Sequence, residues 1–137
     1  MMQAENTFYI GLSERTNKEG IAQANKLLTL RNKKCITVDM PDMLHPKTGV
    51  AYLGNNTLLA VKEFAKNDLF KSFKIIPVPE QEAYAANSIR VNDYVILPKG
   101  FEKTKQNVEQ AGFKVETCDV SEFQKLDGGL SCLSIRF

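Results

Sequence analysis

The chain has 137 residues, of which 43% are hydrophobic and 25% are charged, and its formal net charge at pH 7 is +2. This length fits one domain with a substantial core, and the composition is that of a folded globular protein. No apolar run approaches the ~18 residues of a membrane span. Lysines and arginines are interspersed with acids, so we expect neither a membrane nor a nucleic acid as a partner.

The chain contains three widely spaced cysteines, Cys35, Cys118 and Cys132. This odd number indicates reduced thiols, and we therefore expect a cytoplasmic location. Residues 1–5 also lack the basic and apolar regions of a signal peptide. The cysteines do not have the paired spacing of a zinc site, so we expect no metal. We expect Cys35 and Cys118 to lie in core strands.

The first part of the chain alternates strand, helix and strand. Residues 6–12 are rich in β-forming side chains and residues 34–40 alternate in polarity, so both ranges predict strands. Residues 18–31 between them predict a helix. The candidates for its capping residue are Thr16 and Asn17. Its apolar stripe consists of Ile21, Ala24, Leu27 and Leu28.

The remainder begins with a loop over residues 41–49 that holds His45, the only histidine of the chain. Strands are then predicted over 50–53, 57–61, 74–78, 88–91, 94–97 and 114–118. Helical segments are predicted over 62–70, 101–111 and 121–126. The expected turns are a hairpin at Gly54-Asn55-Asn56, a loop or short turn at Tyr84–Asn87 and a helix stop at Gly112.

The succession of hairpin strand, polar turn, amphipathic helix and return strand occurs three times. The units lie around residues 6–40, 56–78 and 93–120. A unit that recurs every ~20–50 residues is typical of repeat and propeller architectures. Such units bury their apolar faces against their neighbours. The sequence therefore predicts an α/β fold made of about three ββαβ-like modules.

The stretch from Leu126 to Ile135 holds the candidate nucleophile. Gly128 and Gly129 let the backbone take a positive φ or approach another group closely, and Cys132 follows them. With a strand behind it, this cysteine can present its sulfur into a cleft that Asp127 also faces. The alternative is an ordinary turn that Asp127 holds through an Asx interaction, with Cys132 as a small buried hydrophobic residue in a last strand.

A nucleophilic thiolate needs a proton shuttle, and His45 is the one histidine available. It lies among polar residues and before Pro46, which argues against a place in the core. Arg15 follows the first predicted strand, and its planar fork suits a carboxylate. The alternative for Arg15 is a surface arginine paired with Glu14 or Glu19.

Four segments together resemble a known family. FYIGLSERTN, LHPKTG, AANSIRVN and LDGGLSC are similar, in the same order, to the C-terminal half of dimethylarginine dimethylaminohydrolases and related arginine deiminases. The resemblance runs over essentially the whole chain. It implies a pentein, a five-fold pseudosymmetric propeller of ββαβ modules, of which residues 1–137 form a partial propeller as a single domain.

The resemblance also implies a reaction. In this family the cysteine that matches Cys132 attacks the guanidinium carbon, an amine leaves, and water resolves a covalent thiouronium to give citrulline. The resemblance implies that His45 is the general acid and then the base. It implies that Arg15 binds the α-carboxylate of the substrate, while Leu126 and Asp127 lie at its amino-acid end. The implied substrate is arginine or a methylated arginine, and no cofactor is expected.

The family's N-terminal half supplies the acids that grip the guanidinium and the acid that partners the histidine. This sequence begins with Met1-Met2-Gln3-Ala4-Glu5, at the place where the family segment that supplies the acid partner of the histidine would end. We therefore expect a homo-oligomer or the missing N-terminal half to complete the site. The alternatives are a non-catalytic remnant and an oligomeric module that binds a protein partner through exposed sheet edges. Asn87 matches a family loop asparagine, to which we assign a structural role.

Overall fold

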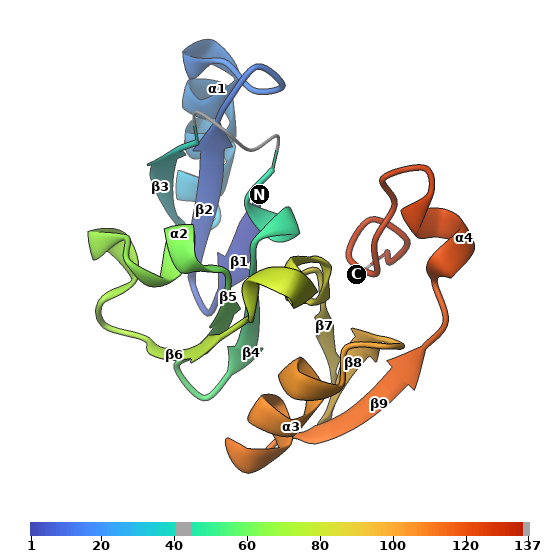
Figure 1. The fold of residues 1–137 in the computed structure, drawn as a ribbon. Coiled ribbons are helices and arrows are strands. Elements are labelled where there is room, and N and C mark those ends of the chain that lie inside the picture. Colours follow the sequence, from blue (N-terminus) through green and yellow to red (C-terminus); the bar gives the residue numbers. More distant parts are fainter. Residues whose placement is uncertain (41–44, 136–137) are drawn as a thin grey trace. The chain divides into compact units, whose positions relative to one another are not determined.

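The structure, a computed structural model, describes residues 1–40 and 45–135, and the chain divides into two compact units, 1–48 and 49–137. The described residues form three sheets of three strands. Each sheet is an antiparallel hairpin whose second strand pairs in parallel with the third. The sheets appear in Figure 1 in the colours blue to teal, green, and olive to orange. The predicted α/β fold of three ββαβ-like modules is confirmed.

The first unit contains one sheet and one α-helix. Its elements are β1 (Met2–Ala4), β2 (Thr7–Leu12), α1 (Lys18–Thr29), β3 (Lys34–Asp39) and the 3-10 turn η1 (Pro46–Thr48). Strand β1 is absent from the sequence prediction, because three residues that alternate buried, exposed and buried give too short a pattern to recognise. The predicted loop at 41–49 lies outside the described residues over 41–44.

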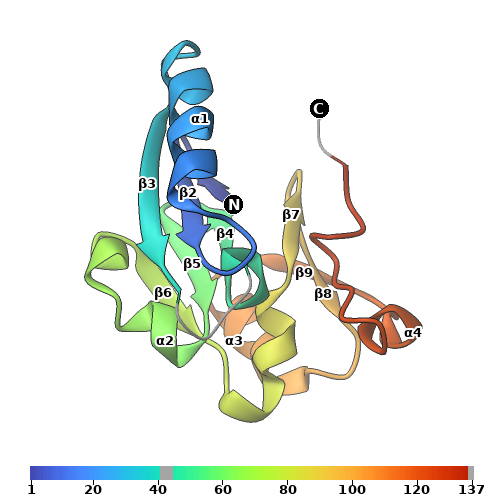
Figure 2. The same cartoon turned by 90° about the horizontal axis from the view of Figure 1, so that it is seen from above.

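Helix α1 packs along β2 and β3, as both views of the first unit show (Figures 1 and 2). Asn17 is its N-cap, since its side chain accepts a hydrogen bond from the Gly20 amide at 2.8 Å. The predicted stripe is narrower than expected: Ile21 is buried, whereas Leu27 is 57% exposed. Ala24 and Leu28 are partly covered, so the covered face of the helix runs from Ile21 to Leu28 and leaves out Leu27.

The second unit contains two sheets with short helices. The strands are β4 (Val50–Gly54), β5 (Thr57–Ala60), β6 (Lys74–Pro77), β7 (Ile89–Val91), β8 (Tyr94–Pro98) and β9 (Lys114–Cys118). The helices are α2 (Lys62–Ala65), η2 (Asp68–Phe70), η3 (Glu80–Ala86), α3 (Glu102–Gln110) and α4 (Ser121–Gln124). Within residues 1–40 and 45–135, no helix is long and apolar enough to cross a membrane.

The helix predicted over residues 62–70 is divided into α2 and η2. Asn67 causes the division, because its side chain accepts a hydrogen bond from the Leu69 amide at 3.0 Å and starts a new turn. Asparagine competes in this way with the helix backbone, which favours caps over helix interiors. Gly112, at φ +90°, ends α3 as predicted.

Arg90 joins the two sheets of the second unit. Its Nη1 donates to the carbonyl of Leu53 at the end of β4, and its Nε donates to the carbonyl of Asn92, each at 2.9 Å. Gly54 makes room for the guanidinium, because a Cβ at this position would overlap Nη1 of Arg90. Gly54 also has a φ of +85°, which other residues adopt only with strain. The hairpin glycine therefore serves the turn and the contact between sheets.

Helix α3 takes its N-terminal cap from another element. Phe101 occupies the cap position without a side-chain hydrogen bond. Instead, the carboxylate of Glu82 in η3 accepts from the amide of Thr104 at 2.7 Å and from its hydroxyl at 2.6 Å. The amide of Lys103 donates to the same carboxylate at 3.2 Å. Free amides of a first helical turn favour a negative charge, so Glu82 ties η3 to α3.

We predict that Glu82→Gln makes the chain less stable in a pH-dependent way. Partial burial raises the pKa of Glu82, but the hydrogen bonds from Thr104 and Lys103 and the charge of Lys103 outweigh it, so the pKa is lower than the ordinary 4.5. The stabilisation is therefore complete above the unfolded-state pKa and is lost as pH falls through the lower folded-state pKa. At pH 7 the variant should lose about 1–2 kcal/mol of unfolding free energy.

Chemical denaturation at pH 7 and at several acidic pH values measures this effect. Glu116→Gln, which alters an exposed carboxylate in β9, is the matched control and should leave stability unchanged. A Glu82→Gln deficit that stays the same at all pH values would contradict the assignment.

Candidate active site

Arg15 lies at the tip of a tight turn between β2 and α1. Ser13 and Thr16 close the turn by two reciprocal backbone hydrogen bonds of 3.2 Å, and the Ser13 hydroxyl accepts from the Arg15 amide at 3.2 Å. The Arg15 residue is exposed. Among the described residues, none of the ion pairs involves Arg15, so the structure does not show the alternative pairing with Glu14 or Glu19.

His45 lies immediately before η1 and is exposed. Its carbonyl accepts hydrogen bonds from the amide and hydroxyl of Thr48, at 3.2 and 2.6 Å. Pro46, the next residue, is fully buried against Gly11 of β2, where an added Cβ would come within 3.0 Å of the proline ring. Gly11 thus lets Pro46 of η1 pack closely against β2. The hydrogen bonds from Thr48 of η1 then fix the backbone of His45.

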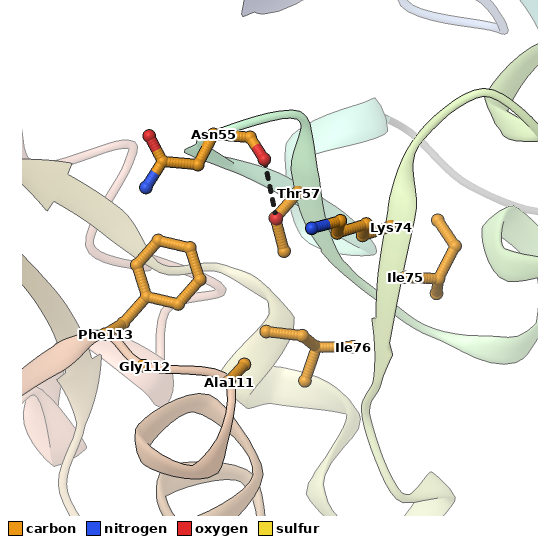
Figure 3. A pocket seen from close by; sticks show the side chains of 8 residues that line it. All are labelled: Asn55, Thr57, Lys74, Ile75, Ile76, Ala111, Gly112 and Phe113. Carbon is orange, nitrogen blue, oxygen red and sulfur yellow. Dashed lines mark hydrogen bonds between the residues drawn. The ribbon is translucent and has the colours of Figure 1, made fainter.

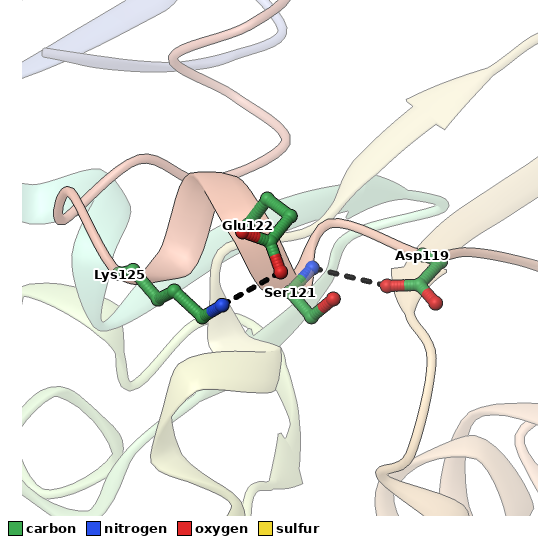
Figure 4. Close-up of polar contacts among 4 residues, drawn as sticks. All are labelled: Asp119, Ser121, Glu122 and Lys125. Atoms are coloured by element: carbon green, nitrogen blue, oxygen red, sulfur yellow. Dashed lines mark hydrogen bonds and ion pairs between the residues drawn. The ribbon is translucent and has the colours of Figure 1, made fainter.

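Helix α4 delivers the chain to the cysteine segment (Figure 4). Asp119 accepts from the Ser121 amide at 3.1 Å, and Lys125 pairs with Glu122 at 2.7 Å. Hydrogen bonds from the Ser121 side chain and amide hold the pKa of Asp119 below its ordinary value. The Glu122–Lys125 pair is exposed on both sides and contributes little to stability.

Leu126 and Asp127 follow α4 on the surface. Leu126 is 85% exposed, and Asp127 has a φ of +56°. Neither Gly128 nor Gly129 has a positive φ, so Asp127 itself makes the left-handed turn. The glycines are needed for close approach instead: a Cβ on Gly128 would lie 3.0 Å from the Phe123 carbonyl.

Cys132 is exposed in a turn and not buried in a strand. The amides of Cys132 and Leu133 both donate to the carbonyl of Gly129, at 2.9 and 3.1 Å. No strand follows at residues 133–135, so the strand expected behind the cysteine is a wrong prediction. The alternative of a buried hydrophobic cysteine is also wrong. Leu130 and Ser131 are buried in its place and anchor the turn from within.

Two side chains hold this turn: Tyr84 in η3, and Asn87, which directly follows η3. The Tyr84 hydroxyl donates to the carbonyl of Gly128 at 2.6 Å. The Asn87 amide is buried; its Oδ1 accepts from the Ser131 amide at 3.0 Å, and its Nδ2 lies 4.0 Å from Sγ of Cys132. The sequence does not single out Tyr84, because no residue pattern near it indicates a partner 44 residues away.

The other two cysteines differ from each other. Cys35 in β3 is partly buried, and this burial raises the pKa of its thiol. Cys118, at the end of β9, is exposed, so its predicted place in the core is wrong. The pattern of β9 explains the error: four of its five residues are exposed, since only Val115 is partly covered. Two exposed thiols, Cys118 and Cys132, are therefore accessible to reagents.

The candidate residues are divided between the two units. Leu126, Asp127 and Cys132 lie in one segment of the second unit with Tyr84 and Asn87 beside it. Arg15 and His45 belong to the first unit. Over residues 1–40 and 45–135, no group of three or more His, Cys, Asp or Glu side chains could hold a metal ion.

A separate pocket of about 390 Å³ lies in the second unit (Figure 3). It is lined by Asn55, Thr57, Lys74, Ile75, Ile76, Ala111, Gly112 and Phe113. The Thr57 hydroxyl donates to the carbonyl of Asn55 at 3.1 Å, as the close-up shows. None of the candidate catalytic residues lines this pocket, whose polar walls include the amine of Lys74 and the hydroxyl of Thr57 but no cysteine or histidine. This pocket is therefore distinct from the turn that holds Cys132.

Comparison with known proteins identifies the family. No family model matches the chain. However, the chain is 44% identical over all of its 137 residues to N(G),N(G)-dimethylarginine dimethylaminohydrolase of Pseudomonas aeruginosa, of which it covers 54%. The chain belongs to the dimethylarginine dimethylaminohydrolase/amidinotransferase family. It spans about half the length of the curated relatives it matches.

Two solved structures of dimethylarginine dimethylaminohydrolase confirm the pentein fold of this family member. A cysteine-to-serine mutant from Pseudomonas aeruginosa complexed with citrulline superimposes with a TM-score of 0.96 at 44% identity, over 99% of this chain and 53% of that one. A histidine-to-glycine variant in an adduct with S-methyl-L-thiocitrulline also gives 0.96 and 44%, over 99% and 54%. The chain therefore has the fold of part of a dimethylarginine dimethylaminohydrolase pentein.

We predict that Gly11→Ala destabilises the first unit. The new methyl group would overlap Sδ of Met40 and press against the ring of Pro46, and overpacking of this kind costs about 1–3 kcal/mol. Thermal unfolding measures the loss. Gly20→Ala in α1 is the control, because its nearest contact is 3.4 Å away and alanine favours a helix, so it should stabilise slightly. Equal effects of the two substitutions would argue against the packing of Pro46 on Gly11.

Proposed function

We propose that the chain is the cysteine-bearing half of a hydrolase that acts on the guanidinium of arginine or a methylated arginine. The observation that carries this proposal is the exposed Cys132, presented on a turn that a buried asparagine anchors. Membership in the dimethylarginine dimethylaminohydrolase family supports the substrate class. The citrulline complex of the cysteine-to-serine relative supports citrulline as the product.

The proposed reaction has two steps. The Cys132 thiolate attacks the guanidinium carbon, forming a carbon–sulfur bond, and the carbon–nitrogen bond to the leaving amine breaks as His45 donates a proton to that amine. Water then adds to the covalent thiouronium, with His45 accepting its proton, and the carbon–sulfur bond breaks to give citrulline and the thiol. A cationic substrate beside the sulfur favours the thiolate, so the substrate helps to activate its nucleophile.

The proposed binding residues lie at exposed turns. Arg15 holds the α-carboxylate of the substrate, and its exposed guanidinium without an ion pair among the described residues supports this role. Leu126 and Asp127 contact the amino-acid end of the substrate, and both are exposed six and five positions before Cys132 in the sequence. The proposal thus assigns residues of both units to one reaction.

We propose that the acids that grip the guanidinium come from a part of the family fold that this sequence does not cover. The chain spans about half the length of its relatives, and a guanidinium buried without carboxylates would cost several kcal/mol. Those acids come from the N-terminal half of the family fold or from another copy of the chain.

The test is citrulline formation from dimethylarginine and from arginine. The chain is assayed alone and mixed with the part of the Pseudomonas aeruginosa relative that it does not match. We expect turnover in at least one of these samples and its complete loss in Cys132→Ala, because no other group replaces the nucleophile. Cys118→Ala, which removes the other exposed thiol, is the matched control and should retain full turnover.

Absence of turnover from a folded chain in both samples would overturn the proposed function. Turnover that survives in Cys132→Ala would overturn the assignment of the nucleophile instead.

A second candidate function is an oligomeric module that binds a protein partner. Four large apolar side chains near the C-terminal end of the second unit are exposed: Phe123, Leu126, Leu133 and Ile135. Leu126 and Ile135 are 85% and 88% exposed, and a partner that covered these four side chains would bury their apolar surface.

The self-association of the chain tests this second candidate. Light scattering after size exclusion should give a molar mass above the 15.4 kDa of one chain, and Leu133→Asp should lower it towards one chain. Glu116→Gln on the exposed surface of β9 is the control and should not change the mass. A mass of one chain at all concentrations would count against self-association.

A further inference from the structure

Asn87 is oriented by a group that can only donate. The Ser131 amide is a backbone N–H, so the atom of Asn87 that lies 3.0 Å from it must be the carbonyl oxygen. This fixes which end of the side-chain amide is which, and its NH₂ group therefore lies on the side of Cys132, 4.0 Å from the sulfur. Asn87 is only 5% exposed, so water does not replace either contact freely.

Gly129 keeps this amide in place. A Cβ on Gly129 would overlap Nδ2 of Asn87 and would come within 2.6 Å of its Cγ. The main chain of the turn therefore lies against the face of the Asn87 amide, which cannot move towards it. A glycine is therefore needed at position 129, because it leaves room for the Asn87 amide donor beside the cysteine.

Tyr84 supports the same turn from the other side of the segment. Its hydroxyl donates to the carbonyl of Gly128, and its pKa is raised by burial and by the nearby Cys132. Tyr84 therefore stays protonated at neutral pH and remains a donor. Besides Tyr84 from η3, the titratable group of the turn itself is Asp127, which is exposed.

We propose that Asn87 is a positioning residue for Cys132, whose sulfur it orients and stabilises as a thiolate through a hydrogen bond from Nδ2. A hydrogen bond to the charged form of a group favours that form. At 4.0 Å the contact with a neutral thiol is weak, and such contacts shorten when charge develops on the acceptor. The proposal rests on the proposed function, in which Cys132 is the nucleophile, and adds a role to a residue assigned only a structural one.

The test is the pH dependence of alkylation by iodoacetamide, which reacts with the thiolate. Peptide mass spectrometry separates Cys132 from Cys118, which is exposed as well and serves as an internal reference in each sample. Asn87→Asp keeps an oxygen that accepts from the Ser131 amide, but it places a carboxylate oxygen where the donor stood. We expect its Cys132 alkylation profile to move to higher pH, with roughly a tenfold slower reaction at pH 7 for each pH unit of the shift.

A second variant keeps the test valid if the buried carboxylate of Asn87→Asp disturbs folding. Gly129→Ala pushes the Asn87 amide aside without adding charge, and should also move the Cys132 profile to higher pH. Asn25→Asp and Gly20→Ala, on the surface of α1, are the matched controls and should leave the profile unchanged. The Cys118 profile should be the same in all samples.

A Cys132 profile that does not move in a folded Asn87→Asp or Gly129→Ala protein overturns the proposal, because a purely structural asparagine would leave the thiol chemistry unaltered. Alkylation needs no turnover, so this result is independent of whether the chain forms citrulline. Where turnover is present, Asn87→Asp should lower kcat at neutral pH and recover part of it at higher pH, with little change in KM.

Discussion

One buried amide, that of Asn87, connects the turn that holds Cys132 to the body of the second unit. Cys132 follows a helix of only four residues and a surface turn, and no strand lies behind it. Such a segment has few contacts of its own to define its position. The buried hydrogen bond from the Ser131 amide to Asn87 holds the segment in position. Because the pair is buried, its loss would leave an unsatisfied polar group, which costs more than the bond itself contributes.

The segment from Glu82 to Asn87 makes side-chain hydrogen bonds to several elements of the second unit. Glu82 caps α3, Tyr84 holds the carbonyl of Gly128, and Asn87 holds the amide of Ser131. Three side chains within six residues thus bind a helix and a turn that follow much later in the chain. Arg90, just beyond, joins the last sheet to the one before it. Side-chain contacts, and not further helices or strands, define the place of the cysteine.

Local chemistry explains which parts of the structure the sequence predicts. Asn17 caps α1 and Gly112 ends α3 because a cap or a left-handed glycine acts over a few residues. The division between α2 and η2 at Asn67 also has a local cause. The sequence does not predict it, because an asparagine can either continue a helix or cap a new turn, and these two preferences compete. The family resemblance located the candidate site, because four short segments in order are more specific than any one of them.

Long-range contacts explain what the sequence does not predict. The cap of α3 lies in Glu82 and not at Phe101, and the partner of Tyr84 is a carbonyl that has no residue signature. The strand expected after Cys132 does not form, although Leu133 and Ile135 are apolar, because no neighbouring strand among the described residues pairs with it. Cys118 looked like a core residue because cysteines often are, but β9 is mostly exposed.

The overlap between Gly129 and Asn87 links the evolution of two positions that are far apart in the sequence. A Cβ at position 129 would overlap the Asn87 amide in its present place, so a side chain there displaces this amide or requires its loss. The two positions are therefore coupled, and the effects of substitutions at both should not add. A lineage in which position 129 carries a side chain would have lost or displaced the amide beside its cysteine, so the residue at 129 reports on the surroundings of the sulfur.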